Sequence, residues 1–247
     1  MPPPSDKLLY FVGCTTSYRN DEIAKATAKI LEKAKISFSI VGLEEKCCGV
    51  PLSSAGFDRT FESLARHNTE VIEEKKTKLV LTTCPSCCRA LRIDYPKLLG
   101  KVKFRTMHVS ELLSDLMNDG RLKFRHSGNA RTVVTYHDPC HLGLHIGIYD
   151  QPRGVLKGIP GIELVEMDRI RERSYCCGSG SGPLRAAFPE LAMSMSEERV
   201  KEAKATGAEI LVTSCPDCLF NLEQASKRIK SGLTVMDLCV LVASRLA

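Results

Sequence analysis

The tripeptide Cys-Cys-Gly occurs twice in this chain, and each copy stands between one upstream cysteine and one downstream Cys-x-x-Cys pair. Ten of the twelve cysteines fall into this frame, five in each half. The first quintet is Cys14, Cys47, Cys48, Cys84 and Cys87, and the second quintet is Cys140, Cys176, Cys177, Cys215 and Cys218. Adjacent cysteines are poor disulfide partners for each other, because the bond needs a geometry that neighbours reach only with strain. The glycine lets the backbone turn sharply beside a bulky group. The frame therefore favours two metal clusters over disulfides.

Matching cysteines of the two halves are separated by similar distances along the chain. Cys14 and Cys140 are 126 residues apart, Cys47 and Cys176 are 129 apart, and Cys84 and Cys215 are 131 apart. Such regular offsets indicate an internal repeat. Short apolar runs alternate with helical patterns in both halves, which is typical of parallel sheets. We predict an α/β fold with two pseudo-twofold-related lobes, each a mainly parallel sheet flanked by helices.

The apolar runs predict eight strands, and amphipathic spacing predicts helices between them. The strands are expected at 8–12, 38–41, 79–83, 102–104, 132–136, 162–167, 210–214 and 233–236. Helices are expected at 20–35, 57–72, 110–117 and 190–206, after each Cys-Pro-x-Cys, and at the C-terminus. Residues 119–130 are polar and contain glycine, so we place the boundary there, with domains at 1–125 and 126–247. In such sheets, sites form beyond the carboxyl ends of strands, where both quintets begin.

Composition excludes several classes of function. The formal charge of +6 is spread along the chain, with no basic run typical of a nucleic-acid-binding arm. This charge is compatible with a solvated surface or with attraction for an anionic substrate or acidic partner. No apolar run approaches the roughly 20 residues that span a bilayer. The segment from Met1 to Lys7 lacks the apolar stretch of a secretory signal. We therefore expect a cytoplasmic protein with no direct membrane span, in which cysteines serve metal or redox chemistry.

Three kinds of site could explain the cysteines. A structural zinc ion takes four ligands, so five cysteines per half would leave one thiolate over in each lobe. Merely buried thiols would not be expected in matched register. Iron–sulfur clusters are bound by thiolates, but the spacing is not that of a bacterial ferredoxin. Pro85 and Pro216 suit the first turn of a helix whose positive end would face an anionic cluster.

The double frame resembles the cysteine-rich CCG domain pair of heterodisulfide reductase. That pair forms the B subunit of the enzyme in methanogenic archaea and the catalytic part of the D subunit in the membrane-linked form. The segment His137-Asp138-Pro139-Cys140-His141-Leu142-Gly143 also resembles the motif that opens the second half in this family. The resemblance covers nearly the whole chain. It implies that each quintet ligates one noncubane [4Fe-4S] cluster, and that the two clusters face one cleft in which a disulfide is split.

The resemblance also implies partners. Some relatives carry a ferredoxin domain in the same chain, and these 247 residues contain no such motif. Electrons are therefore expected from a small ferredoxin-like iron–sulfur protein, similar to the C subunit of the family, and from a flavoprotein, similar to its A subunit, that feeds it. The substrate would be a small disulfide or its thiols. An alternative is an electron-accepting iron–sulfur subunit of a flavin-dependent dehydrogenase for lactate, glycolate, glycerol 3-phosphate or succinate. A zinc-stabilised scaffold without catalysis is a third class.

Other residues near the frame have two interpretations each. His137, His141 and His145 lie four apart, but Pro139 and Gly143 argue against a regular helix that would place them on one face. They either pack beside a cluster, or His137 or His141 acts catalytically, by donating a hydrogen bond to a cluster sulfur or a proton to a leaving thiolate. Separate from these, Cys88 and Cys239 are expected in the core, and Arg185 meets an anionic substrate or is solvated. The segment 179–183 is glycine-rich but lacks the end of a phosphate-binding loop.

Overall fold

The computed structural model describes residues 8–125, 128 and 131–247. The expectation for the segment from Met1 to Lys7 therefore lies outside the described residues. The predicted boundary at 119–130 lies outside them in part, because 126–127 and 129–130 are not described. The division into domains 1–125 and 126–247 stays a prediction.

Two four-stranded sheets organise the chain, and every strand pair in them is parallel. The first has the order β2-β1-β3-β4 and the second the order β6-β5-β7-β8. Their strands are β1 Leu8–Phe11, β2 Phe38–Ile40, β3 Leu79–Thr82, β4 Arg105–His108, β5 Thr132–His137, β6 Ile162–Leu164, β7 Ile210–Thr213 and β8 Thr234–Asp237. The same order in both sheets confirms the predicted fold class and the repeat.

One strand prediction was wrong. The run 102–104 is not a strand, and β4 begins at Arg105, where it pairs with Leu79 at the start of β3. The backbone of Arg105 also bonds to Lys78, so the parallel ladder starts here and earlier residues have no partner strand. Phe104 is buried in the core from the preceding loop, which explains its apolar character. Similarly, β8 is shifted by one residue from the predicted 233–236, and β6 is three residues shorter than the predicted 162–167.

The helices cover both sheets and agree with most expectations. They are α1 Cys14–Tyr18, α2 Asp21–Lys33, α3 Val50–Ser54, α4 Asp58–Glu74, α5 Pro85–Arg89, α6 Tyr95–Leu99, α7 Val109–Asn118, α8 Cys140–Gly143, α9 Asp150–Gly158, α10 Pro183–Ala187, α11 Pro189–Ala205, α12 Pro216–Arg228 and α13 Leu238–Arg245. A π-helical turn, Ala90–Asp94, joins α5 to α6 just before Pro96. Proline lacks the N–H that a regular helix needs there, which accounts for the wider turn.

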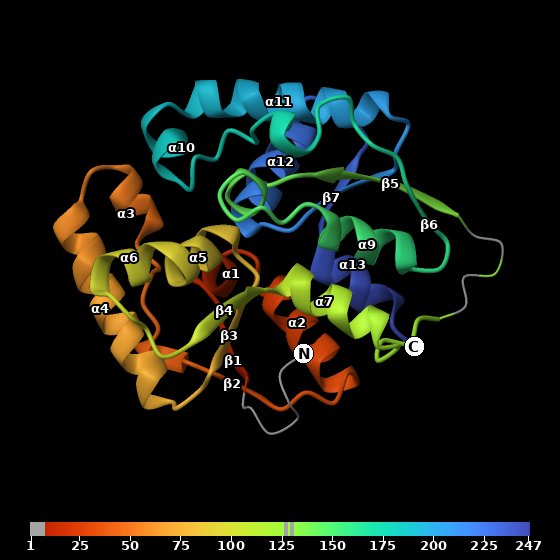
Figure 1. Ribbon diagram of the computed structural model, residues 1–247. Coiled ribbons are helices and arrows are strands. Elements are labelled where there is room, and N and C mark those ends of the chain that lie inside the picture. The colour runs from red at the N-terminus through yellow and green to blue at the C-terminus, as the bar shows by residue number, and fades with distance from the viewer. Residues whose placement is uncertain (1–7, 126–127, 129–130) are drawn as a thin grey trace.

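The two lobes share one hydrophobic core. Tyr10 and Leu81 of the first sheet belong to the same buried cluster as Tyr136 and Val212 of the second. The last helix of each half packs against a helix of the other half: α7 lies on α9, and α13 lies on α2 (Figure 1). Burial of apolar area is the main favourable term in folding. Each half therefore depends on the other for part of its core.

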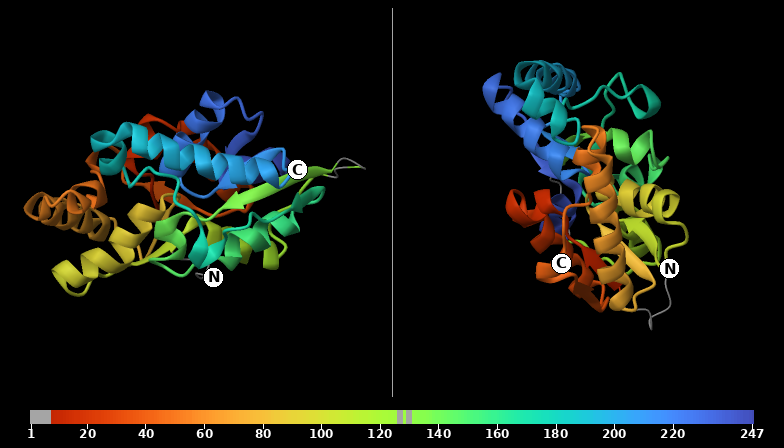
Figure 2. Two further views of the ribbon diagram at one scale, coloured as in Figure 1. Left: turned by 90° about the horizontal axis from the view of Figure 1, so that it is seen from above. Right: turned by 90° about the vertical axis from the view of Figure 1, so that its left-hand side faces the viewer.

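The opposite faces of the sheets have separate cores. Phe11 and Val80 pack under α4 and the α5–α6 segment, and Leu211 packs under α11 and α12. The long helices α4 and α11 lie on the outside of the molecule (Figure 2). In the described part of the chain, no helix is both long and apolar enough to cross a membrane.

Candidate metal centre

The first quintet lies where β1, β3 and the loop before α3 converge. Gly13, at a φ of 82°, turns the chain from β1 so that Cys14 opens α1. Gly49, at a φ of 81°, turns the chain after the Cys47-Cys48 pair, and a Cβ there would collide with Phe61. Cys84 is the N-cap of α5, and Cys87 follows one turn later. All five cysteines line one small cavity.

Sulfur neighbours follow the same order in both halves. In the first, Cys14 Sγ lies 3.8 Å from Cys47 Sγ, and hydrogen-bonding contacts continue from Cys47 to Cys48, Cys87 and Cys84. In the second, contacts run in order through Cys140, Cys176, Cys177, Cys218 and Cys215. The sulfurs of Cys177 and Cys218 are 3.2 Å apart. All twelve cysteines are described, and all are free thiols. The structure thus brings each predicted quintet together.

This crowding shows what the quintets can hold. Hydrogen bonds from Cys140 and then Cys177 lower the pKa of Cys176 to about 2. The same contact with Cys176 raises the pKa of Cys140, and burial adds to it. One thiolate therefore keeps its neighbours protonated, because several negative sulfurs this close repel each other. Ionising all five thiols at this spacing requires compensating positive charge, and an all-thiolate donor set fits an iron–sulfur cluster.

Two contacts join the cysteine loops of opposite lobes in a reciprocal way. Thr15, next to Cys14, donates to Asp217 inside the second Cys-x-x-Cys, with the oxygens 3.3 Å apart. Ser86, inside the first Cys-x-x-Cys, bonds to Nδ1 of His141, next to Cys140, at 2.9 Å. Ser86 also bonds to Ser181 at 3.1 Å.

These contacts lie along the first cavity, because Thr15 and Ser86 also line it. Ser181 and Asp217 of the second lobe line it together with the first quintet. Of the described cysteines, those of the second quintet do not line this cavity. The carboxyl ends of the two sheets thus face each other, with a wall of polar residues where they meet.

Each Cys-Cys pair is held by side chains that bind its carbonyl oxygens. In the first half, Asn68 donates to the oxygen of Cys47 and Tyr95 donates to that of Cys48. In the second half, Ser196 and Asn221 both donate to the oxygen of Cys177, at 2.9 and 2.7 Å. Buried carbonyls need such partners, so these residues fix the loops that present the sulfurs.

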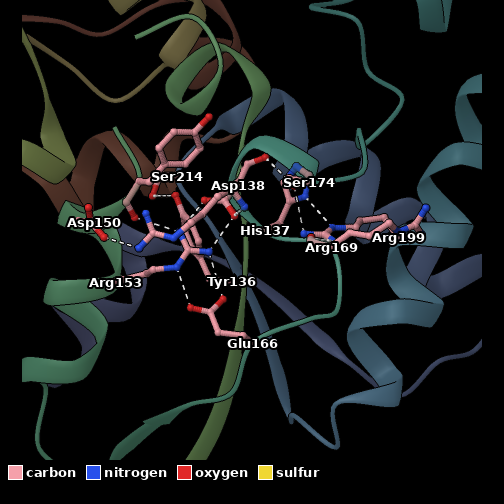
Figure 3. Close-up of polar contacts among 12 residues, drawn as sticks. Tyr136, His137, Asp138, Asp150, Arg153, Glu166, Arg169, Ser174, Arg199 and Ser214 are labelled. Carbon is pink, nitrogen blue, oxygen red and sulfur yellow. Dashed lines mark hydrogen bonds and ion pairs between the residues drawn. The ribbon is translucent and has the colours of Figure 1, made fainter. Parts of the chain in front are cut away.

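His137 ends β5 and points toward the second quintet. One of its ring nitrogens and the sulfurs of Cys177 and Cys218 all lie within 4.8 Å of one another. Its Nδ1 accepts a hydrogen bond from Arg199 Nε at 3.1 Å (Figure 3). Its Nε2 is buried without a hydrogen-bond partner among the described residues. Burial, and then the Arg199 cation, lower the pKa of His137 to about 3, so the ring is neutral.

The other predicted histidine, His141, lies at the junction of the lobes. Burial is the main cause that lowers its pKa to about 4, and His145 adds to the effect. The rings of His141 and His145 meet edge to face, with centroids 4.8 Å apart. Helix α8 is a single turn that begins at Cys140, so His137 lies outside it, on the preceding strand.

Several residues of the site were not found from the sequence. Arg199 is fully buried, and it shares the buried face of α11 with Ala192, Ser196 and Ala203. Because α11 has only a weak amphipathic pattern, its residue spacing gave no clear signal that Arg199 is buried. The roles of Ser86 and Asp217 depend on contacts between lobes, which no local pattern indicates. As expected, Cys88 and Cys239 are buried in the core. Arg185 is half-buried and lies over Phe220, 4.7 Å from the ring centroid.

Comparison with known proteins assigns the sequence that carries both quintets to a family. A family model described as "Cysteine-rich domain", CCG, matches residues 8–92 and 134–223, which contain both quintets. The chain belongs to this CCG domain family. It is 44% identical over 254 aligned residues to the D subunit of dihydromethanophenazine:CoB–CoM heterodisulfide reductase from Methanosarcina mazei. That alignment covers 99% of this chain and 61% of that protein, so the chain spans less than two thirds of this relative.

The name of a second relative includes a cofactor. The chain is 34% identical to a "probable iron-sulfur-binding oxidoreductase" of Bacillus subtilis, over 89% of this chain and 31% of that protein. Among solved structures, a hypothetical protein from Helicobacter pylori superposes with a TM-score of 0.69 and 10% identity. It covers 98% of this chain and 49% of that protein, and at this identity the likeness concerns the fold alone.

Proposed function

We propose that this CCG protein is the iron–sulfur subunit of a heterodisulfide reductase-like oxidoreductase. The reaction takes one disulfide, two electrons and two protons to two thiols, and the same site could run in reverse. A small ferredoxin-like iron–sulfur subunit, fed by a flavoprotein, supplies the electrons. The observation that carries the proposal is the convergence of five cysteines in each lobe, with the same order of sulfur neighbours.

Each quintet would hold one noncubane [4Fe-4S] cluster. Cys14, Cys47, Cys48, Cys84 and Cys87 are the proposed ligands of one, and Cys140, Cys176, Cys177, Cys215 and Cys218 are those of the other. Such clusters would supply the redox chemistry and stabilise the sulfurs of the split bond as anions. The 44% identity to a heterodisulfide reductase chain supports this assignment.

The chain itself must bind the disulfide and deliver protons. The substrate is proposed to lie at the boundary of the lobes, where Ser86, Ser181 and Asp217 line the first cavity. His141 is bonded through Ser86 to Ser181, so it is connected to this cavity wall. We therefore propose that the neutral ring of His141 relays one proton to a leaving thiolate, taking up a proton on one nitrogen as it releases one from the other.

The decisive experiment is anaerobic purification of the full-length protein with its native partners, followed by iron and sulfide analysis. A brown protein containing iron and sulfide is expected, and a colourless protein containing only zinc would contradict the proposal. Electron paramagnetic resonance with added thiol, after oxidation, then tests substrate contact. A new signal on thiol addition supports disulfide chemistry. A cluster-containing protein whose signal does not change on thiol addition, but which accepts electrons from a 2-hydroxyacid flavoprotein, would indicate the dehydrogenase alternative.

The role of His141 is tested separately. We expect His141→Asn to keep its iron and sulfide content while disulfide turnover falls by about 100-fold, as for loss of a proton-transfer group. His145→Asn, which removes the neighbouring ring, is the matched control and should retain turnover. Unchanged turnover in His141→Asn would contradict the role.

A further inference from the structure

His137 has a fixed protonation pattern that follows from its partner. Arg199 Nε always carries a hydrogen and has no lone pair to accept one. The ring nitrogen that faces it, Nδ1, must therefore be the acceptor. A neutral imidazole has one hydrogen, so that hydrogen resides on Nε2. The tautomer is determined by the guanidinium and does not depend on the metal.

This tautomer determines what His137 can do for the second quintet. A histidine that ligates a metal through Nε2 needs its lone pair there and a hydrogen on Nδ1. Arg199 excludes that arrangement, because two N–H groups would then face each other. His137 therefore does not ligate iron through Nε2, whereas its Nε2–H is a free donor on a ring of which one nitrogen lies within 4.8 Å of the sulfurs of Cys177 and Cys218. Its donor is the buried Nε2 group for which the described residues offer no acceptor.

The first half has no equivalent donor among its described residues. The repeat places Phe11, at the end of β1, where β5 has His137, and Phe11 is fully buried in the apolar core. The buried Arg199 of α11 corresponds to Asn68 of α4, which binds backbone groups instead. Buried hydroxyls without a partner in the described part of the chain occur in both halves, among them Thr16 in the first and Ser179 and Thr213 in the second. The imidazole and the guanidinium that holds it therefore distinguish the second half.

Arg199 acts mainly by holding the ring. Its charge is offset by Glu202, whose carboxylate lies 2.8 Å from Nη1, and Glu202 is shared with Arg169. Further hydrogen bonds to Ser174 and to the carbonyl of Arg169 fix the guanidinium in place (Figure 3). Arg199 is thus a positioning residue, and His137 is the group that meets the cofactor.

We propose that His137 donates its Nε2–H to a sulfur of the cluster held by the second quintet. This hydrogen bond gives the second cluster a higher reduction potential than the cluster of the first quintet. A hydrogen bond to cluster sulfur stabilises the reduced, more negative form. The two metal sites of this symmetric scaffold are therefore inequivalent, and an electron entering the protein comes to rest in the second lobe. This inference rests on the proposed function, because it requires that both quintets hold clusters.

The test is a redox titration of the anaerobically purified full-length protein, followed by electron paramagnetic resonance. The wild type should show two midpoint potentials. His137→Phe, which copies the residue of the first half, should lower the higher one and leave the lower one in place. His137→Gln keeps an N–H donor, so its higher midpoint potential should lie between those of the wild type and His137→Phe. Arg199→Met removes the donor that keeps the hydrogen of His137 on Nε2. It should lower the same midpoint potential by a smaller amount than His137→Phe.

Controls separate this inference from the proposal on which it rests. Tyr136→Phe, beside His137 in β5, removes a buried hydroxyl that bonds to Ser214 and should leave both potentials unchanged. Equal wild-type potentials, or unchanged potentials in His137→Phe with full iron content, would overturn the inference and leave the proposed function intact. If His137→Phe loses iron, the potentials of His137→Gln and Arg199→Met decide. A wild-type protein without iron and sulfide would instead overturn the proposed function.

Discussion

The two lobes have the same strand order and the same order of sulfur contacts. The residues that surround the sulfurs differ in their chemistry. Around the first quintet, Phe11 is apolar and Asn68 binds the loop through an amide. Around the second, His137 and Arg199 occupy the corresponding places. The repeat has therefore kept the cysteines of the frame and changed the residues behind them. Geometry is shared between the lobes, whereas electrostatics differs.

The largest expected effect comes from removing one sulfur in either lobe. Cys48→Ser and Cys177→Ser should each lose about half of the iron and sulfide, because each quintet is proposed to hold one cluster. Disulfide turnover should disappear in both. The measurement is metal analysis after anaerobic purification. Cys88→Ala is the control, because Cys88 is buried in the core outside both quintets. This variant should keep its full metal content. Loss of all iron in only one variant would show that the lobes are not independent sites.

The next effect is on stability. Arg199→Met leaves Nδ1 of His137 unpaired and removes a buried cation from Glu202, which should cost about 3–5 kcal/mol. Asn68→Ala, at the corresponding place in the first lobe, leaves neutral groups unpaired and should cost about 1–3 kcal/mol. Urea unfolding of both variants measures the difference. An equal or smaller loss for Arg199→Met would contradict the claim that the second lobe depends on a buried charge.

The helix N-caps at the ends of β4 and β8 should give opposite pH dependences. Burial raises the pKa of Asp237 to about 7, so the folded protein resists its ionisation. This group therefore lowers the free energy of unfolding as pH rises from about 4 to 7. Burial lowers the pKa of His108 to about 4, so that group lowers stability as pH falls from about 6.5 to 4.

Two variants isolate these contributions. Asp237→Asn, which keeps an N-cap acceptor, should remove the loss of stability on the alkaline side, which is about 4 kcal/mol at pH 8 for a pKa raised to about 7. His108→Gln should reduce the loss of stability as the pH falls below about 6.5. Urea unfolding at pH 5, 6 and 8 provides the measurement, and parallel pH profiles in wild type and Asp237→Asn would contradict the assignment.

The smallest effect concerns the reciprocal bonds between lobes. Thr15→Val removes the bond to Asp217, and Ser86→Ala removes the bonds to His141 and Ser181. Each substitution should lower the free energy of unfolding by about 1 kcal/mol. The effect of Ser86→Ala should be the larger, because it leaves two partners without their hydrogen bond. Thermal unfolding measures the stability. Only Ser86→Ala should also slow disulfide turnover, and an equal slowing by Thr15→Val would argue against a proton path through Ser86.

Much of the architecture could be predicted from the sequence because the cysteine frame repeats at nearly constant offsets. Strand and helix patterns indicated the α/β class, and the ends of β1, β3, β5 and β7 located the quintets. The strand at 102–104 was misplaced, because Phe104 is buried from a loop and β4 takes its register from Leu79. Burial produces apolar residues in loops as well as in strands, and sequence alone does not separate them.

The contacts between lobes could not be predicted in the same way. The apolar residues of α7 and α13 indicate that these helices are buried, but not that they pack against the opposite half. Thr15 and Asp217 are 202 positions apart in the chain, so nothing local connects them. Arg199 did not stand out in the sequence because charged residues in helices are usually solvated. His137 was found, but its tautomer required the position of Arg199.

The exchange of terminal helices has a consequence for the origin of the molecule. A single ancestral half would have had no partner for the apolar surfaces that α2 and α9 now give to α13 and α7. Two identical copies could cover each other by trading these helices, as domain-swapped dimers do. Joining the copies in one polypeptide would then have raised their effective concentration to the millimolar range. Within one polypeptide the two copies can carry different residues at one structural position, as Phe11 and His137 do.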